Sequence, residues 1–236
     1  MYDYGNLVYL DLQKTGSRFV VKFLEQTCNL PFRSGIEHTF VRRDYNPKSL
    51  YFITIRHPVQ QYSSLYRYGL GEKIGFVYQN LVSIGKGDLY EKKDWNYNRW
   101  LEFVLDPDNA SCLGEGYDEL PKSVELGFMS FRYLCYATLH PFKLLKLFES
   151  NSDPVGLTLK TSIIDHTIKM EQLNKGLLDF ATVVRPGFFD QNKVLNFFKD
   201  SKPINNSEVK HEEIEKVSEE NLKKIKKKEH LLLQFY

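Results

Sequence analysis

The chain has 236 residues, of which 42% are hydrophobic, and these values are typical of one large domain with a substantial core. Its 32 basic and 30 acidic residues leave a formal charge of +2, so the whole molecule has no strong electrostatic attraction to nucleic acid or to a membrane surface. Any anion-binding site must therefore be local. We expect a single domain over residues 1–236 and no nucleic-acid partner.

Targeting signals and cysteine content bear on the cellular context. Residues 1–10 lack a basic stretch followed by a long apolar core, and no run of about 18 apolar residues occurs in the chain. Three scattered cysteines are too few for a disulfide framework or a zinc cluster. We expect a soluble chain without a membrane segment, either cytoplasmic or trimmed from a luminal enzyme of the secretory pathway.

A strand, a short polar loop and a helix follow one another between residues 6 and 28. Leu7–Leu10 is an apolar run of strand length, and the apolar residues of 19–24 recur at helical spacing. Between them lies Gln13–Ser17, which we call the Lys14 loop. A short turn that contains a glycine can direct several backbone N–H groups at an anion. An ordinary turn with Ser17 as the helix N-cap explains the same residues.

A second unit of the same kind begins with Leu50–Ile55, a run of β-branched and aromatic residues typical of a buried parallel strand. Arg56 follows it directly. Pro58 suits a first helical position, and we expect a helix over Val59–Tyr68 that is closed by Gly69. Two such units predict an α/β fold with a central parallel sheet flanked by helices, where ligands bind beyond the carboxyl ends of the strands.

Apolar periodicity and turn residues predict the remaining elements. A short strand or loop is expected to end near His38, and a later strand to end near Met170 before a helix. A turn is expected at 185–187 and a polar loop at 199–210. The other expected helices occupy residues 76–84, 96–105, 124–138, 141–148 and 212–233.

Three separated groups are candidates for one ligand site. Lys14 supplies a cation at the end of the first strand. Arg56 precedes Ser64 by eight residues, and Ser64 lies roughly 9 Å along the second helix, so a guanidinium and a hydroxyl can hold a second phosphate. His38 lies between the two units, where a general base is needed. An ion pair, helix packing and a half-buried loop histidine are the corresponding structural explanations.

Residues 6–70 resemble a sulfotransferase that uses 3'-phosphoadenosine 5'-phosphosulfate (PAPS). The first signature is Lys14-Thr15-Gly16-Ser17, and the second is Arg56-His57-Pro58 with Ser64. The ending Tyr66-Arg67-Tyr68-Gly69 is similar to that of carbohydrate sulfotransferases of the uronosyl 2-O type. The resemblance implies a P-loop-NTPase-like sulfotransferase fold, PAPS as the sulfuryl donor, and a hydroxyl-bearing acceptor that we expect to be a saccharide.

The resemblance also implies roles for the matched residues. The Lys14 loop would hold the 5'-phosphosulfate, and Arg56 with Ser64 would hold the 3'-phosphate. The family's catalytic histidine or glutamate falls between its two signatures, which implicates His38 as the base and Glu37 as the alternative. Lys14 would stabilise charge on the bridging oxygen of the leaving nucleotide. The chemistry requires no metal.

The chain also departs from the family pattern. Gln13 replaces the proline that commonly precedes the lysine, and Arg18 replaces a second hydroxyl residue, so Arg18 either contacts phosphate or points to solvent. Glu171 resembles a late strand-end acid of the family. Asn206-Ser207 loosely resembles its closing cofactor loop.

Two other functions are compatible with parts of the pattern. A P-loop nucleotide kinase or NTPase predicts G-x-x-x-x-G-K-[ST], but here the lysine precedes the glycine. A sulfotransferase-like binding protein without turnover would keep the fold, yet the expected catalytic residues are all present.

The acceptor-binding residues are the least defined by the sequence, which also does not predict the oligomeric state. Cations could line a cleft for an acidic glycan and aromatic rings could stack on sugars, although surface exposure and helix packing explain these residues equally well. The candidates are Arg42, Arg43, Lys73, Lys86, Lys92, Lys93, Trp95, Tyr97 and Trp100.

Overall fold

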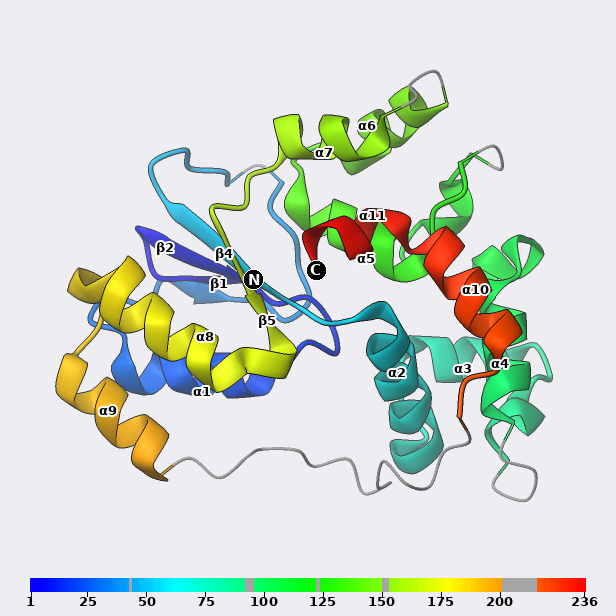
Figure 1. The fold of residues 1–236 in the computed structure, drawn as a ribbon, viewed down its shortest axis with the longest axis horizontal. Helices are drawn as coiled ribbons and strands as arrows, with labels where there is room; N and C mark the ends of the chain where they lie inside the picture. The colour runs from blue at the N-terminus through cyan, green and yellow to red at the C-terminus, as the bar shows by residue number, and fades with distance from the viewer. Residues whose placement is uncertain (43, 92–95, 122–123, 150–152, 201–215) are drawn as a thin grey trace.

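The computed structural model describes residues 1–42, 44–91, 96–121, 124–149, 153–200 and 216–236. In these residues, five strands form one sheet in the spatial order β3-β1-β2-β4-β5 (Figure 1). The strands are β1 (Tyr2–Asp3), β2 (Leu7–Leu10), β3 (Ser34–Gly35), β4 (Leu50–Ile55) and β5 (His166–Lys169).

The sheet is mixed, not entirely parallel as expected. Strands β2, β4 and β5 are parallel neighbours, whereas β1 pairs antiparallel with β2 and with β3. The connection from β1 to β2 is only residues 4–6, and a link this short permits only an antiparallel pair. The parallel part therefore carries the strand ends at which the sequence predicts a ligand site.

Helices cover both faces of the sheet (Figure 1), as the sequence predicts. Helices α1, α8 and α9 lie on one face, and the other helices lie on the opposite side. The helices are α1 (Ser17–Thr27), α2 (Pro58–Glu72), α3 (Phe76–Ser83), α4 (Tyr97–Leu105), α5 (Phe128–Ala137), α6 (Pro141–Phe148), α7 (Pro154–Thr161), α8 (Leu173–Asp179), α9 (Gln191–Asp200), α10 (Glu219–Lys228) and α11 (His230–Phe235).

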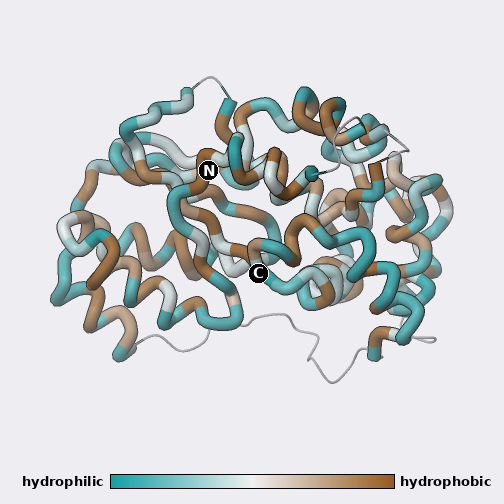
Figure 2. The backbone as a smooth tube through the Cα atoms, turned by 45° about the horizontal axis from the view of Figure 1, so that its top comes forward, coloured by the Kyte–Doolittle hydropathy of each residue, from teal (hydrophilic) through white to brown (hydrophobic). Residues whose placement is uncertain are grey.

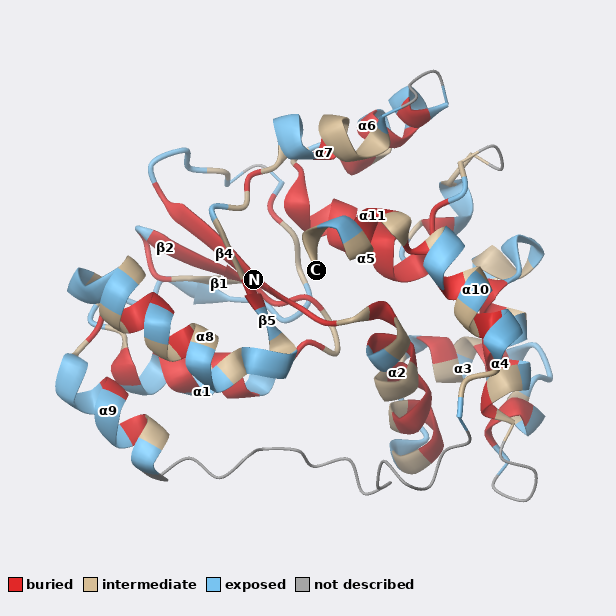
Figure 3. Ribbon diagram, in the orientation of Figure 1, coloured by how far each residue is buried: buried red, intermediate tan, exposed pale blue. Residues whose placement is uncertain are grey.

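Every residue of β2 and β4 is buried (Figure 3), which explains their unbroken apolar sequences. Alternate side chains enter two hydrophobic layers, as strand geometry requires. Val8 and Ile53 belong to the layer under α2, α4 and α5, whereas Tyr9 and Phe52 pack against α1 and α8. Along the outer helices hydrophobic and hydrophilic residues alternate (Figure 2), as expected for helices with one buried side.

Several predicted bounds are close to those observed. The helices expected at 76–84, 96–105 and 141–148 correspond to α3, α4 and α6, and the strand expected to end near Met170 is β5. Arg185 precedes a 3-10 turn over Pro186–Phe188. The expected loop at 199–210 lies almost entirely outside the described residues. No described helix combines the length and apolar character needed to cross a membrane.

Helix α2 does not end at Gly69 as predicted but continues to Glu72, and Lys73 after it adopts a left-handed conformation with φ 53°. A Cβ atom on Gly69 would lie 2.6 Å from Cε1 of Tyr90. The glycine therefore serves close packing inside the helix and does not terminate it.

The helices expected at 124–138 and 212–233 also differ from the prediction. Helix α5 begins at Phe128, and the C-terminal segment is two helices, α10 and α11, that meet at Glu229. Residues 212–215 lie outside the described part. The carboxylate of Glu229 accepts hydrogen bonds from the N–H groups of Met129 (3.2 Å) and Ser130 (2.7 Å), so it caps the start of α5. One long-range contact thus explains both differences.

Glu229 also accepts a 2.6 Å hydrogen bond from the hydroxyl of Tyr62 on α2. We expect Glu229→Ala to lower the free energy of unfolding by about 2 kcal/mol, because it leaves these buried donors without an acceptor. Urea denaturation measures the change. As a control, Glu220→Ala removes an exposed carboxylate paired with Lys224 on the same helix and should leave the stability nearly unchanged. Equal losses in the two variants would contradict the capping role.

Candidate functional site

The Lys14 loop and Arg56 lie side by side at the carboxyl ends of β2 and β4. Nη1 of Arg56 donates to the backbone carbonyl of Lys14 (3.4 Å), and Nε2 of Gln61 on α2 donates to the carbonyl of Gln13 (2.9 Å). These contacts are possible because β2 and β4 are parallel neighbours, with Leu10 opposite Ile53. The structure thus brings the two sequence signatures to one place.

The Lys14 loop has a constrained backbone. Lys14 has φ 65° and Gly16 has φ 89°, both in the left-handed region. Gly16 is the N-cap of α1 without a side-chain cap, so Ser17 is the first helical residue, and the alternative explanation with Ser17 as the N-cap is wrong. A Cβ on Gly16 would lie 2.9 Å from Cδ2 of Leu173, so this position requires glycine for both conformation and space.

The hydroxyl groups of the loop mainly bond within the protein. Thr15 is fully buried and its Oγ1 donates to the carbonyl of Leu12 (2.6 Å) and lies 2.8 Å from Oγ1 of Thr54. Oγ of Ser17, which is half-buried, donates to the same carbonyl at 3.2 Å. The side chain of Thr15 therefore holds the loop in shape, and only its backbone is suited to ligand contact. Arg18 is exposed on the first turn of α1.

The ammonium group of Lys14 lies against helix α2, with Nζ 3.0 Å from the centroid of the Tyr68 ring. Burial, reinforced by the positive charges of Arg132, Arg18 and Arg56, lowers the pKa of Lys14 to about 7. A desolvated lysine among guanidinium groups is stabilised in its charged form when an anion binds beside it.

Helix α2 presents one face to the Lys14 loop. Gln61 contacts the carbonyl of Gln13 and Tyr68 contacts the side chain of Lys14, and these two helical residues are seven positions apart. Ser64 is three residues after Gln61, so it lies on the same face between the two contacts. It is half-buried there. Ser64 therefore lies on the side of α2 that faces the Lys14 loop.

Arg56 is only 7% exposed, and its Nε has no hydrogen-bond partner. Burial, together with the charge of Arg67, lowers its pKa, and the carboxylate of Glu171 opposes this effect. Glu171 itself accepts a 3.2 Å hydrogen bond from the backbone N–H of His57. A buried guanidinium that is only partly hydrogen-bonded costs free energy, and an anionic ligand would remove that cost.

His38 lies close to Asp11, the residue after β2. The backbone N–H of His38 donates to Oδ2 of Asp11 (2.8 Å), and Nδ1 of its ring is 3.4 Å from the same oxygen. Hydrogen bonding to Asp11 raises the pKa of His38, although burial opposes this effect. A carboxylate beside Nδ1 orients the imidazole and leaves Nε2 for proton transfer. The sequence prediction missed Asp11, whose only signal was an acid directly after an apolar strand.

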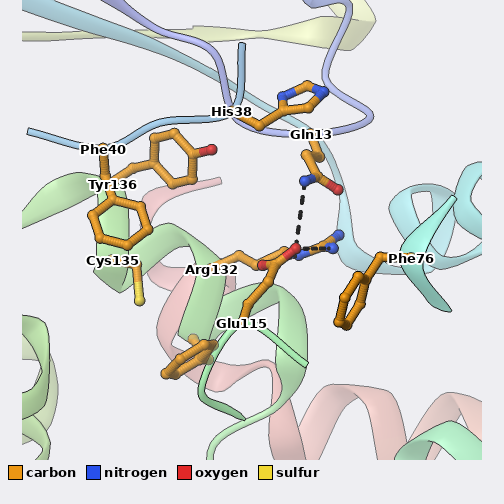
Figure 4. Close-up of a pocket in the computed structure, with 9 residues that line it drawn as sticks. Gln13, His38, Phe40, Phe76, Glu115, Arg132, Cys135 and Tyr136 are labelled. Carbon is orange, nitrogen blue, oxygen red and sulfur yellow. Dashed lines mark hydrogen bonds and ion pairs between the residues drawn. The ribbon is translucent and has the colours of Figure 1, made fainter. Parts of the chain in front are cut away.

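A cavity of about 270 Å³ adjoins His38 and the Lys14 loop (Figure 4). It lies between the segments that follow β2 and β3 and the helices α3 and α5. Glu37 is exposed and does not line it. The lining residues are Gln13, His38, Phe40, Phe76, Glu115, Phe131, Arg132, Cys135 and Tyr136.

A bidentate ion pair between Arg132 and Glu115 forms one wall of this cavity. Nε and Nη2 of Arg132 donate to the two carboxylate oxygens of Glu115 at 2.8 and 2.6 Å, and the guanidinium carbon lies 4.1 Å from the centroid of the Phe128 ring. Nε2 of Gln13 donates to Oε1 of Glu115 at 3.4 Å (Figure 4). Arg132 is almost completely buried, so this pair fixes the position of the Glu115 carboxylate.

The acceptor-binding residues expected from sequence do not line this cavity in the described part of the chain. Trp100 and Tyr97 are buried in helix packing, where Nε1 of Trp100 donates to the hydroxyl of Tyr90 (2.8 Å). Expecting these two rings to stack on a sugar is therefore wrong. The other described candidates, none of which contributes to the cavity wall, are Arg42, Lys73 and Lys86. Four acceptor candidates, Arg43, Lys92, Lys93 and Trp95, lie outside the described residues, as does Asn206-Ser207 of the expected cofactor loop.

Comparison of the chain with protein-family models, with curated proteins and with solved structures found no match. Among the residues described, no group of three or more His, Cys, Asp or Glu side chains is arranged to hold a metal ion. The features that indicate a function are the contacts of the Lys14 loop, Arg56 and His38 and the adjoining cavity.

Proposed function

We propose that this protein is a sulfotransferase, which transfers the sulfuryl group of PAPS to a hydroxyl group of an acceptor. The observation that carries the proposal is the contact between Nη1 of Arg56 and the carbonyl of Lys14. It holds the Arg56 guanidinium against the backbone of the Lys14 loop, and the sequence resemblance assigns these two elements to the two ends of one nucleotide. The cavity beside His38 provides room for an acceptor at the same place.

The donor is recognised as an anion at both ends. The backbone of the Lys14 loop, at the start of α1, and the ammonium group of Lys14 bind the 5'-phosphosulfate. Arg56 and Ser64 bind the 3'-phosphate. The residues fit this role, because Nε of Arg56 is buried without a partner and burial has already lowered the pKa of Lys14. The nucleotide supplies the electrophilic sulfur.

The protein residues position and stabilise the reacting groups. A bond forms between the acceptor oxygen and sulfur while the bond from sulfur to the bridging phosphate oxygen breaks. The acceptor proton passes to Nε2 of His38, whose other ring nitrogen lies beside Asp11. The electron pair of the broken bond stays on the bridging oxygen, where the charge of Lys14 stabilises it. Transfer of this kind depends on alignment more than on covalent catalysis.

The cavity supports a saccharide as the acceptor. The carboxylate of Glu115 and the amide of Gln13 can exchange hydrogen bonds with hydroxyl groups, and Phe40, Phe76 and Tyr136 provide rings for sugar faces. Because Arg132 neutralises Glu115, the wall carries no unpaired carboxylate that would repel the donor.

Calorimetric titration with 3'-phosphoadenosine 5'-phosphate, the nucleotide product, tests the proposal. We expect binding without magnesium, and we expect Arg56→Ala to weaken it about 10- to 100-fold, because a charge-assisted phosphate contact contributes about 1.5–3 kcal/mol. Arg99→Ala, which removes an exposed cation on α4, is the control and should bind normally. Magnesium-dependent binding of ATP, with no binding of the 3'-phosphorylated nucleotide, would overturn the proposal in favour of a nucleotide kinase or NTPase.

A further inference from the structure

Arg67 on α2 is a buried cation that the roles assigned above do not use. Its side chain is only 4% exposed, and neither Nε nor Nη1 has a hydrogen-bond partner. No carboxylate in the described part of the chain forms an ion pair with it. Native proteins rarely bury a guanidinium in this state, because the lost hydration is not replaced.

Arg67 lies near a second buried guanidinium in a similar state. After burial, the positive charge of Arg67 is the main cause that lowers the pKa of Arg56, and Nε of Arg56 is also without a partner. Two buried like charges that repel each other destabilise the folded protein unless an anion lies between them. A group with two negative charges would satisfy both side chains at once.

The position of Arg67 on α2 connects it with the phosphate-binding face. Arg67 is three residues after Ser64, so the two side chains lie on neighbouring positions of one side of the helix. Tyr97, buried on α4, has its ring centroid 5.1 Å from that of Tyr66, the residue before Arg67, and its hydroxyl also has no hydrogen-bond partner. The hydroxyl groups of Ser64 and Tyr97 and the guanidinium of Arg67 therefore lie along α2, the helix that begins two residues after Arg56.

We propose that Arg67 is a phosphate-binding residue that, together with Arg56, holds the 3'-phosphate of the nucleotide, with the hydroxyl of Tyr97 as a further donor. The identity of the nucleotide rests on the proposed function. The need for a dianion rests only on the two buried guanidinium groups. Arg67 thereby helps to select nucleotides that carry a 3'-phosphate over those that do not.

Calorimetric titration of Arg67→Gln with two nucleotides tests this role. Its affinity for 3'-phosphoadenosine 5'-phosphate should fall at least tenfold, while its affinity for adenosine 5'-monophosphate, which has no 3'-phosphate, should stay within twofold of wild type. Tyr97→Phe, which removes only a hydroxyl, should lower the ratio of the two affinities about threefold and should preserve the packing of the core. Arg99→Gln is the matched control with an exposed arginine and should change neither affinity.

A second readout does not need the nucleotide. In the absence of ligand, Arg67→Met should unfold at a higher urea concentration than wild type, because it removes an unpaired buried charge. Inorganic phosphate should raise the melting temperature of wild type more than that of Arg67→Met.

The outcomes separate the two proposals. If wild type binds 3'-phosphoadenosine 5'-phosphate but Arg67→Gln and Tyr97→Phe keep its full preference, the role of Arg67 is wrong and the proposed function stands. If wild type does not bind this nucleotide, but phosphate stabilises it in an Arg67-dependent way, the dianion site stands and the proposed function is wrong. A loss of stability in ligand-free Arg67→Met would contradict the inference.

Discussion

Replacing His38 with alanine should lower the rate of sulfuryl transfer by about 10²- to 10⁴-fold, the usual contribution of a general base. The affinity for 3'-phosphoadenosine 5'-phosphate should stay within about twofold, because His38 lies at the cavity and not at the phosphate-binding groups. Turnover with a saccharide acceptor and calorimetric titration measure the two quantities separately.

Glu37→Gln is the matched control, because Glu37 directly precedes His38 in the chain but does not line the cavity. It should keep its turnover within about twofold. Loss of transfer in Glu37→Gln together with normal turnover in His38→Ala would assign the base to the carboxylate.

The pH dependence of the rate gives an independent measure of the same residue. Hydrogen bonding to Asp11 raises the pKa of His38 above 6.5, so the rate should increase with pH and level off only above that value. Asp11→Asn removes the negative charge that stabilises the imidazolium. The pKa of His38 should then fall, and the rising part of the profile should move to lower pH. A profile that does not move would remove Asp11 as the partner of the base.

Replacing Lys14 with methionine should lower transfer by about 10²- to 10³-fold, because the leaving phosphate oxygen then develops its charge without a nearby cation. Methionine keeps an unbranched apolar chain against Tyr68.

The same substitution should change the number of protons that the protein takes up when the nucleotide binds. Burial and neighbouring cations lower the pKa of Lys14 to about 7, so at pH 8 the free protein carries it mostly neutral, and an anionic nucleotide should restore its proton.

Titration at pH 8 in buffers with different ionisation enthalpies measures this uptake. Wild type should take up close to one proton per nucleotide, and Lys14→Met should take up less. Without ligand, the unfolded chain binds the lysine proton between pH 7 and 10.5 and the folded protein does not, so the Lys14 contribution to stability should rise with pH across this window. Proton release on binding would contradict the assignment.

The sequence predicted the parallel part of the fold well, because β2 and β4 are apolar on both faces and each is followed by a polar loop and a helix. It missed β1, which has two residues, and also α7 and α9, and it predicted β3 only as a short strand or loop that ends near His38. Gly69 was wrongly predicted to end the helix. It is a glycine because the ring of Tyr90 packs closely against it, and a local sequence pattern does not show such a contact. The contacts of Glu229 with α5 and α2 likewise determine that the C-terminal segment is divided into α10 and α11.

For the candidate site, local motifs indicated residues that lie at strand ends and in the first helical turns. Lys14 and Arg56 could be found in this way because each lies in the polar loop that follows an apolar strand. Glu115 and Arg132 could not, since they come from a polar segment and from a helix whose buried face looks like ordinary core. Their pairing depends on how α5 is placed against the sheet, which the sequence pattern does not define.

The capping carboxylate of Glu229 has a further consequence for catalysis. Through Tyr62 it holds the helix that carries Ser64 and Arg67, and through the N–H of Ser130 it holds the helix that carries Arg132. In the proposed reaction, one side chain that is remote from the reacting atoms would thus set the spacing between the nucleotide and the acceptor. Because in-line transfer tolerates little misplacement, the C-terminal helices would then determine how well the sulfur is aligned with the acceptor oxygen.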